Sequence, residues 1–427
     1  MNNSTHKCLT ILRDENVQSK SDYVFKKKST HIGFIASSIG FPNGMAGAQR
    51  VKLLARGMIE NDIYVTLLHL RVSEFPPYIH NSAVKGDYNG ISFEYTTGTT
   101  TRPNNFWKRR LVEMRGTLVG LYRLHALKKQ GKLDCVYYYG GVLQFTTLQL
   151  LFLQYLKQLE IPVIMDLCER PWSLGNKTNS IGQIISPISG IKGVVAISKF
   201  LSKWTLSESQ RINHPVKLLK VPILIDINDF GAFSLYSDSR PKVLFAASSG
   251  YDNSFSFVLD AMSHVWKQIP ECQLIITGIE PSRESSRQLL REIQGRSCNQ
   301  NVILKGYISR EELLQEYATS NALLAPLFDD VRSRARFPTK IGEYLASRRP
   351  LITNNVGEIC EYLQDGISAA ISEPGDPIAF GEKIIYVLQN PELAERIGKE
   401  GWRIAYEHFH YQIHSKQIAD LVRGISS

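Results

Sequence analysis

The stretch RFPTKIGEYLASRRPLITNN, residues 336–355, decides the fold. An aromatic residue and a proline lead into a short helical pattern, and an apolar strand pattern follows directly. Pro338 at the first helical position costs no hydrogen bond and presets the helical backbone. Because a helix N-terminus has free N–H groups and the positive end of the dipole, the backbone at Thr339 and Lys340 suits a phosphate. The stretch therefore predicts a phosphate-binding helix N-terminus at Thr339 and Lys340.

Glu343 extends this pattern one turn further into the helix. It points to the same side as Thr339 and Lys340, where its carboxylate can accept hydrogen bonds from a ribose diol while a diphosphate occupies the helix tip. This arrangement predicts a sugar-nucleotide site. The alternative is a surface ion pair between Glu343 and Lys340 on an amphipathic helix, and a single motif leaves both interpretations open.

The same residues carry a family resemblance. The stretch resembles the nucleotide-sugar region of retaining GT-B glycosyltransferases, in the large group 1 (family 4-like) class that builds bacterial surface polysaccharides. The usual form there is Glu, seven residues, then Glu-(Tyr/Ala)-x-Ala-x-Gly-x-Pro-Val-Ile. Glu343 matches the second Glu, and Phe337 matches the aromatic residue that follows the first. Ala335 stands where the first Glu, which contacts the donor hexose, is usual, and Pro338 replaces a glycine.

A second departure concerns the donor diphosphate. Members of the family usually carry an Arg and a Lys after the first strand of the second domain, whereas this chain has SSGYDNSFSF at 248–257. A diphosphate still needs positive partners. If residues 332–336 form an extended loop, alternate side chains share a face, and Arg332, Arg334 and Arg336 can join Lys340 as the diphosphate grip. The chain is then a variant subgroup, and a non-catalytic protein stays open as the alternative.

Length and composition indicate a globular protein with two domains. The chain has 427 residues, 43% hydrophobic and 21% charged, which is too long for one ordinary core. Its six cysteines lie far apart with no Cys-x-x-Cys pair, which argues against a zinc site or a disulfide framework and favours a reducing cytoplasm. No metal or other cofactor is expected, because neither a DxD-type pair nor a His/Cys cluster stands out.

Strand and helix patterns alternate in two successive segments of the chain, and these segments set the expected domain boundaries. The pattern predicts an α/β GT-B architecture of two Rossmann-like domains facing each other across a cleft, as the resemblance also implies. The expected segments are a polar basic tail at 1–30, an acceptor-side domain at 31–225, a nucleotide-sugar domain at 226–405 and a C-terminal helix at 406–427 that packs back on the first domain. The tail lacks the apolar run of a signal peptide, and no stretch reaches the roughly 18 apolar residues of a spanning helix.

The first alternating segment opens with a strand at 31–41, a glycine loop and a helix. Gly44 and Gly47 let the backbone approach a ligand closely, and the loop resembles the glycine loop of the same glycosyltransferases. The alternative is a simple turn that requires positive φ. Ligands of open α/β sheets bind after such a strand, so we expect both glycines to help bind the donor.

Two carboxylates follow a later strand, in IMDLCERPW. Asp166 and Glu169 emerge at the carboxyl end of this strand, at the edge that faces the crevice, and are candidate catalytic bases or acceptor-binding groups. The alternative is a pair of loop acids bonded to neighbouring backbone or to Arg170. The predicted donor-binding set is Gly44, Gly47, Arg334, Arg336, Thr339, Lys340 and Glu343.

The excess of positive charge lies in the first half of the chain. Residues 1–225 hold 29 Lys or Arg against 14 Asp or Glu, while 226–427 hold 21 against 26. Between 101 and 132 nine basic residues accompany one acid, and an apolar stripe recurs at helical spacing. Such a helix can lie on an anionic membrane, although a core helix with solvated charges is the common alternative. Nucleic acid is not expected as a partner, because no binding motif accompanies the basic face.

These observations together predict a hexosyltransferase. The resemblance implies transfer of a hexose, with retention, from a nucleoside diphosphate sugar to a glycan or lipid-linked glycan, in the cytoplasm or peripherally on the inner face of the membrane. A non-catalytic GT-B scaffold in glycan assembly and, more weakly, a sugar-nucleotide epimerase are the alternatives. The base, the hexose, the acceptor and the oligomeric state cannot be predicted from motifs.

Overall fold

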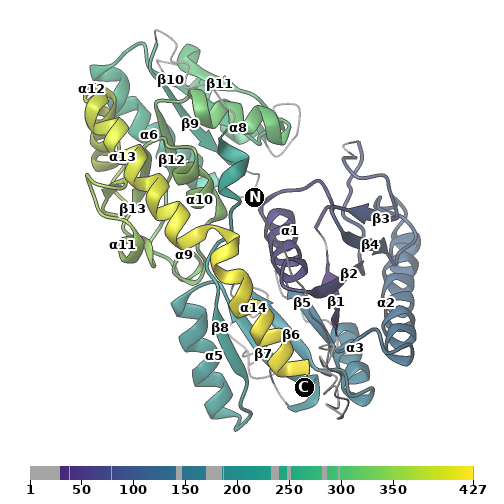
Figure 1. Ribbon diagram of the computed structural model, residues 1–427. Helices are drawn as coiled ribbons and strands as arrows, with labels where there is room; N and C mark the ends of the chain where they lie inside the picture. The colour runs from purple at the N-terminus through teal and green to yellow at the C-terminus, as the bar shows by residue number, and fades with distance from the viewer. Residues whose placement is uncertain are drawn as a thin grey trace, which may run out of the picture.

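Two α/β domains form the molecule, with a cleft between them (Figure 1). The computed structural model describes residues 29–426 apart from 38, 78, 141–146, 170–184, 186, 232–239, 248–251, 281–285 and 297–298. The predicted tail thus lies almost entirely outside the described residues, as do residues 232–239.

The first sheet is almost wholly parallel. Its described strands run in the order β3-β4-β2-β1-β5-β6-β7-β8, and only β3 and β4 pair antiparallel. The strands are β1 (Thr30–Ala36), β2 (Ile63–His69), β3 (Lys85–Tyr88), β4 (Ile91–Tyr95), β5 (Cys135–Gly140), β6 (Val163–Leu167), β7 (Ile191–Ala196) and β8 (Lys217–Lys220). The helices are α1 (Ala46–Ile59), α2 (Phe106–Lys129), α3 (Thr147–Gln158) and α5 (Lys199–Arg211), with a short η1 (Pro187–Ser189).

The second sheet has the strand order of a dinucleotide-binding domain. Its described strands run β11-β10-β9-β12-β13-β14, all parallel, which is the order 3-2-1-4-5-6. The strands are β9 (Lys242–Ala246), β10 (Gln273–Thr277), β11 (Val302–Leu304), β12 (Ala322–Ala325), β13 (Leu351–Asn354) and β14 (Ala370–Ser372). The helices are η2 (Ile227–Phe230), α6 (Asp252–Gln268), α7 (Arg287–Gln294), η4 (Asn299–Asn301), α8 (Arg310–Thr319), α9 (Val331–Ala335), α10 (Thr339–Ala346), α11 (Ile359–Tyr362), α12 (Pro377–Gln389), α13 (Pro391–Ile404) and η5 (Ala405–Phe409).

These sheets confirm the predicted two-domain α/β architecture. Continuous apolar runs predicted most of the strands, because parallel strands are buried on both faces. The segment KLLK at 217–220 lies within the expected first domain, at 31–225, and was not predicted as a strand. It is β8, an edge strand of the first sheet, and short edge strands tolerate lysines that a central strand does not.

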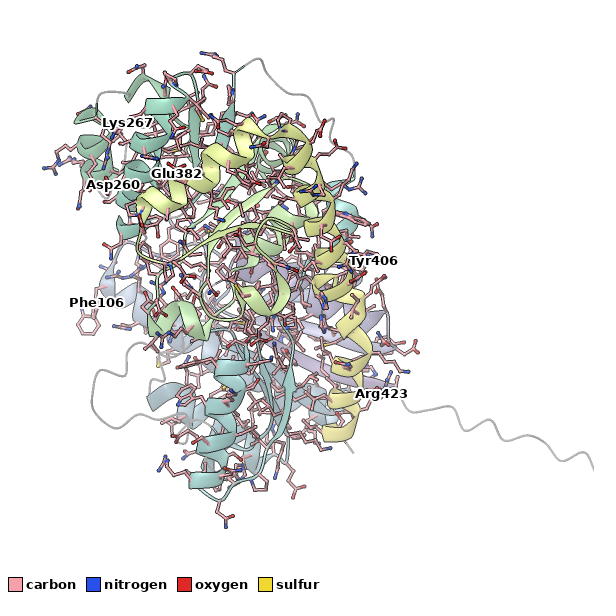
Figure 2. All side chains as sticks on the ribbon, turned by 90° about the vertical axis from the view of Figure 1, so that its left-hand side faces the viewer. Phe106, Asp260, Lys267, Glu382, Tyr406 and Arg423 are labelled. Atoms are coloured by element: carbon pink, nitrogen blue, oxygen red, sulfur yellow. The ribbon has the colours of Figure 1, made fainter. Side chains whose placement is uncertain are left out.

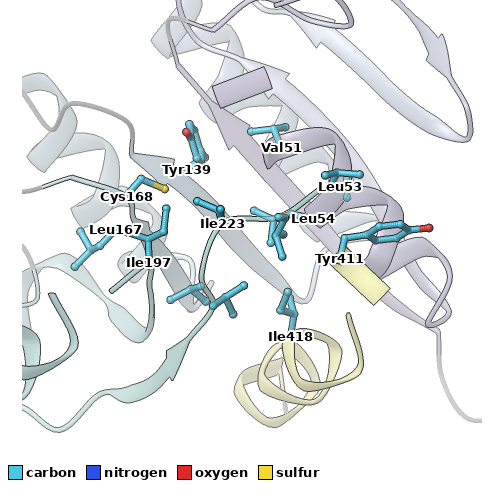
Figure 3. Close-up of a cluster of buried hydrophobic side chains, with 14 of the residues drawn as sticks. Val51, Leu53, Leu54, Tyr139, Leu167, Cys168, Ile197, Ile223, Tyr411 and Ile418 are labelled. Carbon is cyan, nitrogen blue, oxygen red and sulfur yellow. The ribbon is translucent and has the colours of Figure 1, made fainter. Parts of the chain in front are cut away.

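The C-terminal helix α14 (Tyr411–Ser426) leaves the second domain and lies on the first (Figure 1). Its Tyr411 and Ile418 belong to the same buried cluster as Leu54 of α1 (Figure 3). The two helices approach most closely at Gly57, where an added Cβ would stand 2.3 Å from Oγ of Ser415. The absence of a side chain at this position is therefore what lets α14 reach α1.

Candidate active site between the two domains

A cavity of about 970 Å³ lies between the domains. Its walls include the carboxyl ends of β1, β5 and β6 in the first sheet and of β9, β10 and β12 in the second. Ligands of open parallel sheets bind outside these strand ends, so both domains contribute the edge on which binding residues are expected.

The N-terminus of α10 forms one wall of this cleft. Thr339 and Lys340 both line it. Pro338 is the extended N-cap residue of α10, one position before the first helical position predicted for it. Nζ of Lys340 donates a hydrogen bond to the carbonyl oxygen of Ala246 at 2.5 Å. Burial, followed by the nearby charge of Arg336, lowers the pKa of Lys340 to about 8. A cation next to free helix N–H groups is a suitable place for a phosphate.

The arginines before α10 are arranged differently from the prediction. Residues 331–335 form a helical turn, α9, and the expectation of an extended loop is wrong. Arg332 lies in this turn, Arg336 follows it directly as its extended C-cap residue, and both line the cleft. Arg334 does not line it, because its guanidinium is half exposed and pairs with Asp329 at 2.6 Å.

Glu343 lies in the cleft wall with both carboxylate oxygens engaged. One oxygen pairs with the guanidinium of Arg310, and the other accepts a hydrogen bond from the hydroxyl of Tyr317 at 3.1 Å. The residue is only 8% exposed. The alternative of a surface ion pair with Lys340 is therefore wrong, and any ribose hydroxyl at Glu343 would share the carboxylate with Arg310.

The two glycines of the first loop also line the cleft. Neither has a positive φ, so the alternative of a turn that requires positive φ is wrong. A Cβ at Gly44 would stand 2.7 Å from Cβ of Ala48, and one at Gly47 would stand 3.2 Å from the hydroxyl of Tyr139. Close packing explains the glycines at these positions.

Asp166 is completely buried and lies outside the residues that line the cleft. Its carboxylate pairs with Arg50 at 3.3 Å and accepts a hydrogen bond from the hydroxyl of Tyr137 at 2.7 Å. Arg50 also donates to the carbonyl oxygens of Val221 and Pro222, at the start of the connection to the second domain. This geometry suits Asp166 to hold Arg50 in place, and it does not bring the carboxylate to a ligand in the cleft.

Glu169, by contrast, reaches the cleft. Its side chain is 24% exposed, and Oε1 lies 3.7 Å from Nη1 of Arg336 on the other domain. Oε2 is buried and accepts no hydrogen bond within the described part of the chain. The alternative pairing with Arg170 concerns a residue outside the described ones. Of the two predicted carboxylates, only Glu169 is placed where it can act on a bound molecule.

Several cleft residues were not predicted from the sequence: Arg50, Arg71, Tyr307, Arg310 and Cys168. The SREE pattern at 309–312 does signal a helix start, and Ser309 and Glu312 form a capping box there. It does not indicate that Arg310 turns toward Glu343 in the neighbouring helix. Within the described residues, no group of three or more His, Cys, Asp or Glu side chains could hold a metal ion. The absence of a metal requirement stays a prediction.

Comparison with known proteins finds a family model that covers one wall of the cleft. Residues 230–403 match the family model described as glycosyl transferases group 1. The match covers the second domain, which is less than half of the chain, and it shows what this domain is similar to. The segment that contains α9 and α10 lies inside this match, as the resemblance in residues 336–355 predicted.

Part of this chain is similar to a curated protein. It is 22% identical over 189 residues to the alpha-D-kanosaminyltransferase of Streptomyces kanamyceticus, a match that spans 44% of this chain and 47% of that protein. The match thus covers about half the length of the relative.

Solved structures show the fold of the whole chain. Sucrose-phosphate synthase from Thermosynechococcus elongatus superposes with a TM-score of 0.66 at 15% identity, covering 92% of this chain and 98% of that one. HepE from Anabaena, solved in complex with UDP and glucose, superposes with a TM-score of 0.62 at 13% identity, covering 92% and 100%. A glycosyltransferase from Rickettsia africae gives 0.66 at 14% identity, covering 93% and 99%. The chain has the two-domain GT-B fold.

Proposed function

We propose that this chain is a retaining glycosyltransferase that transfers a hexose from a nucleoside diphosphate sugar to a glycan or lipid-linked glycan, in surface polysaccharide biosynthesis. The observation that carries the proposal is the convergence of Arg332, Arg336, Lys340 and the α10 N-terminus on one end of a cleft that also contains Glu343. Positive groups and a ribose acceptor at this spacing suit a nucleoside diphosphate. A structural relative is described in complex with UDP and glucose, which supports the same donor class.

The donor diphosphate would lie between the α10 N-terminus and the side chains of Arg332 and Arg336. Lys340 and Arg336 would then replace the Arg and Lys that the family usually carries after the first strand of the second domain. The ribose would lie against Glu343. On the opposite wall, Gly44 and Gly47 leave room for the sugar or its diphosphate, and Glu169 faces the same space.

In the proposed reaction, the oxygen of an acceptor hydroxyl forms a bond to the anomeric carbon of the donor sugar. The bond from that carbon to the diphosphate oxygen breaks, and its electron pair stays on the diphosphate. The hydroxyl proton passes to the leaving diphosphate on the same face, which retains the configuration. Positive groups around the diphosphate stabilise the charge that develops there, and this type of electrostatic stabilisation is a large contribution to catalysis.

Helix α2 supports a membrane surface as the place of the reaction. It lies on the outer flank of the first domain (Figure 1) and packs on it through Gly116, Gly120 and Leu124. Its opposite face exposes an apolar stripe made of Trp107, Leu111, Met114, Leu118 and Tyr122. Trp107 is 73% exposed, and Phe106 beside it protrudes from the surface in Figure 2.

The exposed face of α2 carries an apolar stripe, whereas the exposed face of a core helix is usually polar or charged. Exposed basic residues flank it, among them Lys108 and Arg115 on one side and Arg110 on the other. A helix with an exposed apolar stripe between cations suits the interface of an anionic membrane. In the described part of the chain, no helix combines the length and the apolar character needed to cross a bilayer.

A donor screen tests the proposed activity. The purified chain is heated with uridine, guanosine and adenosine diphosphate sugars, and the donor that raises the unfolding temperature is then assayed for nucleotide release with glycan acceptors. One donor class should stabilise the wild type and turn over. If a nucleotide sugar stabilises the chain but no glycan acceptor or extracted lipid-linked acceptor gives turnover, the result would favour the non-catalytic scaffold. That alternative is based on Ala335, which stands where the family usually has a Glu. No stabilisation by any nucleotide sugar would contradict the proposal.

A further inference from the structure

A second cavity opens beside the cleft. It has a volume of about 280 Å³ and lies between α2 and the carboxyl ends of the first-sheet strands. The residues that line both cavities are Ser37, Arg71, Tyr138 and Gln149. They follow or end β1, β2 and β5 or begin α3, so the two cavities meet at the ligand-binding edge of the first sheet.

The junction between the cavities offers hydrogen-bond donors and one positive charge. Tyr138 is buried, and its hydroxyl accepts a hydrogen bond from the side-chain amide of Gln149 at 3.3 Å. Arg71 is half-buried, and its charge acts on the same phenol. Within the described residues Arg71 has neither a carboxylate partner nor a hydrogen-bond acceptor. A half-buried guanidinium of this kind suits a phosphate, which it can bind through two parallel hydrogen bonds.

Beyond the junction, the second cavity becomes apolar and leads to the surface. Leu70 and Phe152 form buried parts of its wall, and Met114 of α2 forms part of its outer side. Met114 also belongs to the exposed apolar stripe that we assign to the membrane. At the mouth, Arg110 pairs with Glu113 at 2.9 Å, so the carboxylate there is already neutralised.

This route exists because α2 lies unusually close to β2. An added Cβ at Gly116 would stand 2.2 Å from the carbonyl oxygen of Leu70, which is an impossible contact. The glycine lets the helix backbone settle beside the residue that precedes Arg71. The exposed apolar stripe of α2 is thereby held next to Arg71.

We propose that the second cavity is the binding site for a lipid phosphate acceptor. The phosphate, or the first phosphate of a diphosphate, binds Arg71 at the junction. The first part of the lipid chain lies against Leu70, Phe152 and Met114 and continues into the membrane under α2. The glycan on the other side of the phosphate enters the cleft, where its hydroxyl faces the donor. This inference rests on the proposed sugar transfer and narrows its acceptor from any glycan to a glycan carried on a lipid phosphate.

The probe for this site is decyl phosphate, kept below the concentration at which it forms micelles, and its binding is measured by calorimetry. Decanol and inorganic phosphate are the two half-ligands. Wild type should bind decyl phosphate more tightly than either half, because charge and apolar contact act together. Arg71→Gln should weaken decyl phosphate binding about tenfold to a hundredfold, the usual effect of losing a charged hydrogen bond. Arg102→Gln, which removes an exposed charge outside both cavities, is the matched control and should leave binding unchanged.

Two further variants make the outcome specific. Thr117→Phe fills the second cavity and should weaken decyl phosphate while leaving inorganic phosphate unaffected. Lys340→Gln should weaken nucleoside diphosphate and leave decyl phosphate unchanged, whereas Arg71→Gln should preserve nucleoside diphosphate binding. Loss of decyl phosphate binding in Lys340→Gln, or its retention in Arg71→Gln, would overturn the acceptor site. If nucleoside diphosphate fails to bind the wild type, the proposed transfer itself is wrong, so the two failures are distinguishable.

Discussion

Arg336 and Arg334 provide a matched pair for testing the diphosphate grip. They lie two residues apart and carry the same charge. Arg334 lies in the helical turn α9 and Arg336 directly follows it, and their side chains point in different directions. The side chain of Arg336 is 14% exposed and lines the cleft, while that of Arg334 is 51% exposed and pairs with Asp329 outside it. We expect Arg336→Gln to weaken nucleoside diphosphate binding and Arg334→Gln to leave it nearly unchanged.

The size of the effect follows from the surroundings of Arg336. Two unit charges about 4 Å apart interact by about 4 kcal/mol at an effective dielectric constant near 20, and by about 1 kcal/mol in bulk water. The cleft lies between these limits, and a hydrogen bond to a charged group contributes about 1.5–3 kcal/mol. Arg336→Gln should therefore raise the dissociation constant of the diphosphate about tenfold to a hundredfold.

Calorimetric titration with a nucleoside diphosphate and with the matching nucleoside separates the contribution of the diphosphate charge from the contribution of the nucleoside contacts. Arg336→Gln should lose diphosphate affinity and keep nucleoside affinity, and Arg336→Lys should recover part of the loss. Because Arg336 also faces Glu169, thermal unfolding of each variant checks that the domains remain intact. The reasoning is refuted if Arg334→Gln loses as much affinity as Arg336→Gln, or if nucleoside and diphosphate binding fall together.

Further predictions address the pH dependence, the ribose contact, the membrane and the C-terminal helix. Burial lowers the pKa of Lys340 to about 8, so its ammonium is lost as the pH rises through that value. Diphosphate affinity should fall between about pH 7 and about pH 9, and Lys340→Gln should lack this dependence when titrated over the same range. Glu343→Gln should weaken donor use about tenfold or more through loss of a charge-assisted bond, and unchanged donor kinetics would contradict the ribose assignment. Trp107→Ser combined with Leu118→Ser should release the protein from sedimenting anionic vesicles at low salt without changing its unfolding temperature. Gly57→Leu should lower the free energy of unfolding by about 1–3 kcal/mol in denaturant titration, because α14 can no longer approach α1.

The sequence by itself determined most of the strands and helices and the resemblance to group 1 glycosyltransferases. Strand and helix patterns depend on residues within one or two turns of each other, and continuous apolar runs at β9, β10 and β12 already require a sheet covered on both faces. The start of α10 was equally local, because proline and the free N–H groups that follow it need no distant partner. These features predict a phosphate-binding helix N-terminus at Thr339 before any tertiary contact is known.

Only the tertiary structure decided which way the charged side chains point. The one-turn helix α9 directs Arg336 into the cleft and Arg334 out of it, and the partner of Glu343 comes from another helix 33 positions away in the chain. Asp166 and Glu169 look equivalent in the sequence, yet the first is buried against Arg50 and the second faces the cleft. The outward direction of the apolar stripe on α2 likewise follows from the packing of its glycines on Leu70. Periodicity can show that a helix has two faces, but which face is buried depends on surfaces contributed by distant parts of the chain.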